Sequence, residues 1–104
     1  MNGVIENKVP MHVLWAKLEK LVELGLTRSL GVSNFNIQFL ADLLTYAKIK
    51  PVANQVQIYP ECAQPELVRW LQSKEIVPVG YSPVGKMGVR HGSAKFECIN
   101  HPVV

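Results

Sequence analysis

A unit of helix followed by strand recurs along this chain at a constant interval, and this repeat limits the possible folds more than any other feature. Short apolar segments with the character of buried strands span residues 28–33 (RSLGVS), 52–58 (VANQVQI) and 76–82 (IVPVGYS), each beginning 24 residues after the last. Short apolar strands that alternate with helical segments are typical of βα units joined in a parallel sheet. The sequence therefore predicts the α/β class.

Each predicted strand follows an amphipathic segment with apolar residues at helical spacing. The predicted helices span residues 13–24, 37–47 and 65–73. Gly25 stands just past the first, where a residue without a Cβ most easily adopts a left-handed cap. Asn36 is placed to cap the second helix, and Pro65 suits the first turn of the third. These residues set the expected helix ends.

Size and composition exclude several classes of protein. The chain has 104 residues, of which 48% are hydrophobic and 18% charged, so one folded domain is expected rather than a disordered chain. No apolar run approaches the ~20 residues of a membrane span, and the first ten residues lack a signal-peptide core. With only two cysteines, we expect a cytoplasmic protein with no membrane partner. The net charge of +3 is spread along the chain, so no nucleic-acid partner is expected.

Polar and aromatic side chains stand at the ends of all three predicted strands. Ser33 and Asn34 end the first, Gln55 lies in the second, and Tyr81 ends the third. Ligands of parallel α/β sheets bind at the carboxyl ends of the strands. Hydroxyl and amide groups match a carboxamide, and a Tyr ring can stack on a heteroaromatic ring. Each residue alone fits a structural role, Ser33 and Asn34 as helix caps and Gln55 as a buried amide. Together they favour a site for a neutral planar ligand that carries an amide.

A near-match to a phosphate-binding loop follows the third strand. Residues 80–87 (GYSPVGKM) nearly fit G-x-x-x-x-G-K-[ST]. Met87 stands where Ser or Thr must hold Mg²⁺, and Pro83 removes a backbone N–H from the loop. The sequence therefore disfavours a true P-loop.

A metal site is disfavoured as well. Cys98 and His101 have a C-x₂-H spacing, with His91 nearby, but a zinc site usually has two pairs of ligands. Cys62 has no neighbour with which to form the second pair. We expect no metal.

Three strings in the chain resemble the central part of the aldo-keto reductase family. They are residues 25–35 (GLTRSLGVSNF), residues 50–55 (KPVANQ) and residues 81–83 (YSP), and the resemblance extends over residues 15–85. That family folds as a (β/α)₈ TIM barrel, which takes ~250 residues. The resemblance therefore implies that residues 1–104 are a single partial reductase domain. It would hold about three βα units, with strands like the fifth to seventh of the barrel, and residues 86–104 would form a loop and tail.

The resemblance also implies roles for individual residues. Ser33, Asn34 and Gln55 would bind the nicotinamide carboxamide of NADPH, or less often NADH, and Tyr81 would stack on the nicotinamide ring. The cofactor-binding set is completed by Ser82, Val84 and Gly85, at the start of the loop over the pyrophosphate. The family reduces aldehydes and ketones, but its catalytic Asp, Tyr, Lys and His come from earlier strands and none maps onto this chain. The 104 residues alone are therefore expected to be inactive.

The alternative interpretation is a catalytically inactive truncated remnant that serves as a nucleotide-binding or interaction module. Three units of a barrel leave two open sheet edges, and such edges pair with other chains. We therefore expect the isolated chain to associate with itself. Two residues depart from the family's pattern in ways that affect stability: Glu75 at a left-handed helix end, and Pro78 inside a strand.

Overall fold

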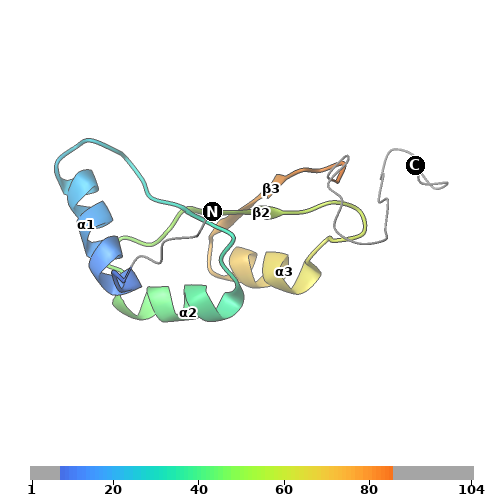
Figure 1. The fold of residues 1–104 in the computed structure, drawn as a ribbon, viewed down its shortest axis with the longest axis horizontal. Coiled ribbons are helices and arrows are strands. Elements are labelled where there is room, and N and C mark those ends of the chain that lie inside the picture. The colour runs from blue at the N-terminus through green and yellow to red at the C-terminus, as the bar shows by residue number, and fades with distance from the viewer. Residues whose placement is uncertain (1–7, 86–104) are drawn as a thin grey trace, which may run out of the picture.

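A computed structural model describes residues 8–85, which form a three-stranded parallel sheet with helices between the strands (Figure 1). The elements in chain order are α1 (Met11–Glu23), β1 (Val32–Ser33), α2 (Ile37–Tyr46), β2 (Ala53–Gln57), α3 (Pro65–Ser73) and β3 (Val77–Tyr81). The strand order in the sheet is β1-β2-β3. Both the α/β class and the three predicted βα repeats are thus confirmed. The arrangement is an arc of the kind that builds a (β/α)₈ barrel.

The first strand is shorter than the sequence predicts, because only Val32 and Ser33 of residues 28–33 pair with β2. The reason lies at Val52, whose N–H donates to Leu30 O while its carbonyl accepts from Val77 N. A regular strand residue directs both groups to the same neighbour. The ladder therefore begins only at Ala53, and the segment before Val32 is left outside it.

The helix ends follow the predicted capping residues. Asn36 caps α2, its side chain accepting from Phe39 N at 2.8 Å. Gly25 adopts φ +72°, with Gly25 N donating to Val22 O and Leu26 N to Leu21 O. This pair of bonds is a Schellman motif, which closes α1.

The same motif closes α3, but with a different residue in the left-handed position. Glu75 N donates to Gln72 O and Ile76 N to Leu71 O, and Glu75 itself has φ +58°. The predicted left-handed Glu75 is therefore confirmed. Pro78 lies within β3, as predicted, and β3 is an outer strand of the three described.

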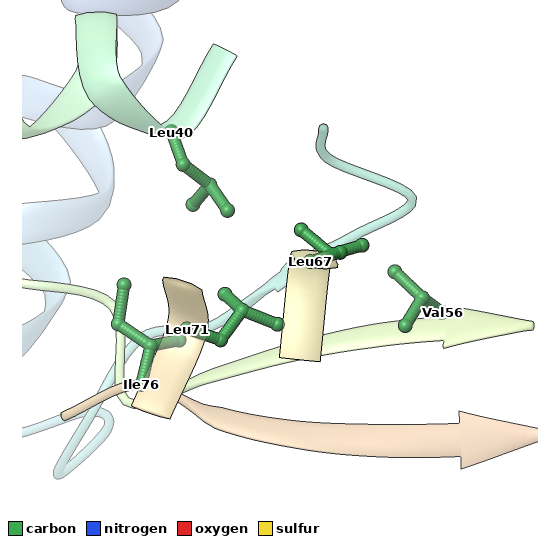
Figure 2. Close-up of a cluster of buried hydrophobic side chains, with 5 residues drawn as sticks. All are labelled: Leu40, Val56, Leu67, Leu71 and Ile76. Carbon is green, nitrogen blue, oxygen red and sulfur yellow. The ribbon is translucent and has the colours of Figure 1, made fainter. Parts of the chain in front are cut away.

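The core lies between the helices and one face of the sheet. One cluster joins α2, β2, α3 and the residue before β3, and Figure 2 shows its side chains: Leu40, Val56, Leu67, Leu71 and Ile76. A second cluster packs α1 against α2 around Trp15, Leu30 and Leu43. The buried positions of each helix recur at helical spacing, so one face of α2 and of α3 packs toward the sheet and one face of α1 packs toward α2.

Within residues 8–85 the other face of the sheet has no covering element. Side chains alternate along β2, so that Asn54 and Val56 are buried while Gln55 between them is exposed. On β3 the exposed apolar residues are Val77 (58%) and Val79 (37%). Gly31, directly before β1, passes close to β2, because a Cβ there would lie 3.2 Å from Ala53 O. The exposed face is the one that bears Gln55.

None of the described helices is long and apolar enough to cross a membrane.

Candidate functional site

The turn after β1 places two of the predicted residues beside β2. Ser33 is in register with Gln55, and its Oγ donates to Gln55 O at 2.9 Å. The same carbonyl accepts from Asn34 N at 2.9 Å. Asn34 has φ +59°, a left-handed conformation that Asn tolerates better than most residues. The chain therefore leaves the sheet sharply, with both Ser33 and Asn34 exposed.

The third strand contributes Tyr81, which reaches across β2 to the turn after β1. Tyr81 Oη donates to Asn34 Oδ1 at 2.8 Å, although the two residues are 47 apart in sequence. Tyr81 is in register with Gln57, which lies two residues after Gln55 on β2, and Ser33 lies on the far side of β2. The structure thus places Ser33, Asn34 and Tyr81 at the carboxyl ends of β1 and β3, while Gln55 lies opposite Ser33 in the middle of β2. What they bind there stays a prediction.

The contacts contradict the purely structural roles that each residue alone would suggest. Asn36, not Ser33 or Asn34, caps α2. Gln55 is exposed rather than buried, and within residues 8–85 its side chain makes no hydrogen bond. Among the described residues, the two donors and the acceptor of the Gln55 amide therefore have no partner.

The remaining predicted residues form a turn directly after β3. Gly85 N donates to Ser82 O at 2.9 Å, with Pro83 and Val84 between them. Ser82 and Gly85 have positive φ values of +50° and +79°, and Val84 is half exposed. This is a tight turn with Pro at its second position. Gly80, the first residue of the near P-loop match, lies inside β3, while Lys86 and Met87 fall outside the described residues.

One residue of this region was not predicted as part of the site. Asn54 is fully buried, yet its side chain bonds the backbone of Phe35, accepting from Phe35 N at 3.3 Å and donating to Phe35 O at 2.8 Å. The alternation of buried and exposed side chains along β2 is the signal that could have identified Asn54, because it puts Asn54 on the helix-facing side of the sheet with Val56. A buried amide needs hydrogen-bond partners, and these had to come from a neighbouring element.

The site residues carry no formal charge, and the described part of the chain holds no group of three or more His, Cys, Asp or Glu side chains placed to bind a metal ion. The candidate ligands His91, Cys98 and His101 lie outside the described residues.

Burial, with a smaller contribution from Asp42, raises the pKa of Tyr46 above its ordinary value. Tyr46 ends α2 and stacks edge-on against His12, so it is not one of the residues gathered at the strand ends.

A separate cavity of about 500 Å³ lies where α2 and α3 begin. Its lining residues are Asn36, Ile37, Gln38, Gln64, Pro65, Glu66 and Leu67. It shares none of them with the predicted site. The four predicted residues instead lie on the open rim of the sheet.

A family model described as the aldo/keto reductase family matches residues 4–98. The chain belongs to this family. Aldose reductase C of Dictyostelium discoideum is 56% identical over 78 residues, a match that covers 75% of this chain and 24% of that protein. The chain therefore spans about a quarter of the length of the curated relatives it matches.

Solved structures of the aldo/keto reductase family share the fold. Aldose reductase from Giardia lamblia superimposes with a TM-score of 0.77 at 42% identity, covering 80% of this chain and 27% of that one. An aldo-keto reductase of the silkworm Bombyx mori, complexed with NADPH, gives a TM-score of 0.76 at 37% identity, covering 80% and 25%. These matches confirm the predicted family and the predicted barrel type of the fold.

Proposed function

We propose that this chain forms part of the cofactor site of an NADPH-dependent reductase that acts on small aldehydes and ketones, with NADH as the alternative cofactor. The observation that carries the proposal is the arrangement of four side chains on neighbouring parallel strands: Ser33 and Asn34 at the end of β1, Gln55 opposite Ser33 in the middle of β2, and Tyr81 at the end of β3. Two of them are already joined, through the Tyr81 Oη–Asn34 Oδ1 hydrogen bond. The NADPH complex of a related structure supports the choice of cofactor.

The unused hydrogen-bonding groups fit a carboxamide. Asn34 Oδ1 is taken by Tyr81, which leaves the Asn34 Nδ2 donors for the carboxamide oxygen. The Ser33 hydroxyl proton goes to Gln55 O, which leaves the Oγ lone pairs to accept from the carboxamide nitrogen. The Gln55 amide can bind at either end. The donor set therefore matches both ends of a nicotinamide carboxamide.

The chain's own residues would act by orienting the cofactor. Once bound, the cofactor supplies a hydride to the carbonyl carbon of the substrate. Tyr81 would cover one face of the nicotinamide ring and leave the other face open, and Ser82, Val84 and Gly85 would begin the loop over the pyrophosphate. We assign no catalytic residue and no metal to this chain, so the complete reaction needs groups outside it.

The test is a titration of the ¹⁵N-labelled chain with NADPH and with NADH up to millimolar concentration, where weak binding is still resolved residue by residue. We expect the largest shifts at Ser33, Asn34 and the Gln55 side chain. In a Gln55→Leu variant, binding should weaken between about twofold and tenfold, as for the loss of one or two hydrogen bonds.

The control is Gln72→Leu, which makes the same change on the exposed side of α3 and should leave binding unchanged. Shifts confined to the cavity at the starts of α2 and α3, or an equal effect of both variants, would contradict the proposal.

The alternative, an inactive remnant that binds nucleotides or other chains, makes a different prediction about size. An antibody to residues 16–31 should detect a band of about 30 kDa or more if these residues function within a complete barrel. A band at 11.6 kDa would favour the remnant. We further propose a cytoplasmic location, which rests on the sequence alone.

Self-association of the isolated chain also remains a prediction. The exposed Val77 and Val79 and the outer edges of β1 and β3 support it. Light scattering should give a mass above that of one chain. A single monomer peak together with a cooperative thermal transition would contradict it.

A further inference from the structure

Asn54 is unusual among the described residues because it is a fully buried amide on the apolar side of the sheet. Its neighbour Val56 lies in the core cluster of Figure 2. A buried amide without hydrogen-bond partners destabilises a fold, so buried amides in folded proteins are nearly always hydrogen-bonded. Both halves of the Asn54 amide are bonded, and both bonds go to the backbone of Phe35.

Phe35 is the residue at which the chain has left the sheet. The ladder between β1 and β2 ends with Ser33 opposite Gln55, and Asn34 N still donates to Gln55 O. One residue later, the Asn54 side chain takes over as the partner of Phe35 N and Phe35 O. The side chain of β2 thus extends the pairing beyond the last strand residue of β1.

Asn34 is therefore held on both sides. Its own N–H is bound to Gln55 O, and the next residue is bound by Asn54. Between these anchors Asn34 adopts φ +59°, a conformation that an L-residue rarely adopts unless its surroundings impose it. In this conformation its side chain meets Tyr81 Oη.

We propose that Asn54 is a positioning residue, which holds Asn34 in the left-handed conformation that presents its side chain to Tyr81 and to the nicotinamide carboxamide. The part that concerns the carboxamide rests on the proposed function. The part that concerns Asn34 and Tyr81 does not. Asn54 would act from the buried side of the sheet on groups that lie on its exposed rim.

The first measurement needs no variant and no cofactor. Amide hydrogen exchange of the full chain should show Phe35 N–H protected to the level of the β2 amides, although no backbone carbonyl accepts it. Exchange of Phe35 at the rate of an open loop would overturn the proposal, because the Asn54 bonds would then not be closed.

The second measurement compares two variants near the same turn. Asn54→Leu keeps the approximate volume but removes the amide, and Asn36→Ala removes the cap of α2. Both should lower stability, but only Asn54→Leu should shift the Asn34 side-chain amide resonances and speed Phe35 exchange roughly 5- to 150-fold. Equal shifts in both variants, or none in either, would mean that Asn54 is merely structural and would overturn the proposal. Should Asn54→Leu fail to fold, the exchange measurement on the unmodified chain decides.

The binding measurement separates this inference from the proposed function. If the unmodified chain binds NADPH, Asn54→Leu should weaken binding about fivefold or more, while Asn36→Ala changes it less than twofold. Equal weakening in both variants would overturn the positioning role. If the unmodified chain does not bind NADPH, the proposed function fails. The exchange and resonance measurements still decide whether Asn54 positions Asn34.

Discussion

The two ends of the sheet differ in what their polar groups do. At the amino ends of the strands, polar side chains bind backbone of the same chain. Glu19 Oε2 accepts from Lys48 N at 3.1 Å and Ile49 N at 2.9 Å, and Trp15 Nε1 donates to Ile49 O at 3.0 Å. Lys50 Nζ donates to Lys74 O at 2.6 Å.

Toward the carboxyl ends, some side-chain hydrogen-bonding groups have no partner among the described residues. The Gln55 amide makes no hydrogen bond within residues 8–85, and the Asn34 Nδ2 donors are not used by Tyr81. In (β/α)₈ barrels the carboxyl face carries the site and the opposite face carries stability. Substitutions at the amino end should therefore change the free energy of unfolding, and those at the carboxyl end should change binding.

The largest loss of stability is expected for Trp15→Ala at the amino end. Trp15 is 1% exposed and packs against Leu30 and Leu43, so its removal should cost about 3–5 kcal/mol. That is comparable to the whole stability of a small domain, and far-ultraviolet circular dichroism should show an unfolded chain. Trp70→Ala is the matched control, because Trp70 is only half-buried and should cost less. Equal losses of stability in Trp15→Ala and Trp70→Ala would show that the deeper burial of Trp15 does not increase its contribution to the free energy of unfolding.

Glu19→Ala should produce the next largest effect. Its loss leaves the Lys48 and Ile49 N–H groups without their acceptor, at a cost of about 1.5–3 kcal/mol in urea denaturation. Glu23→Ala removes an exposed pair with Lys20 and should cost less than about 1 kcal/mol. Similar midpoints for both variants would show that the buried carboxylate contributes nothing beyond a surface charge.

Ser33→Ala tests the opposite end of the sheet. Gln55 O keeps its bond from Asn34 N, so stability should fall by less than about 1 kcal/mol. NADPH binding, measured by the same titration as for Gln55, should weaken between about twofold and tenfold. A large loss of stability with unchanged NADPH binding would contradict the assignment of binding to the carboxyl ends of the strands and of stability to their amino ends.

The smallest effect concerns the two Schellman caps. Glu75→Gly should raise the free energy of unfolding by about 0.5–1 kcal/mol, because glycine adopts φ +58° without steric cost. Gly25→Ala is the reciprocal change. It should lower stability by about 1 kcal/mol with no clash, since nothing lies within 4 Å of the added Cβ. Thermal denaturation of Glu75→Gly and Gly25→Ala measures both changes in stability. Shifts of the same sign would show that φ does not govern these caps.

Local signals were sufficient to predict the helices and the family. Pro65 at the start and the apolar spacing predicted α3 as Pro65–Ser73, with the bounds that the structure gives. Asn36 and Gly25 predicted two helix ends for the same reason, since a cap is a property of a few neighbouring residues.

Features that depend on distant residues were harder to predict. The start of β1 is set by Val52, 20 residues further along, whose two backbone groups bond on opposite sides. The role of Asn54 depends on Phe35, which is 19 residues away and comes near only once β1 and β2 are paired. The burial of Asn54 was not predicted from the sequence, and strand alternation could not have shown which backbone group would be its partner.

The Tyr81 Oη–Asn34 Oδ1 hydrogen bond joins the two outer strands over the middle one. Neighbouring strands lie about 4.8 Å apart, so β1 and β3 are separated by roughly twice that distance, which the long Tyr81 side chain covers. The bond therefore ties the turn after β1 to the end of β3 across the top of β2. Neither segment can shift away from the other without breaking it, so the two outer parts of the arc are coupled through their side chains as well as through the ladder of β2.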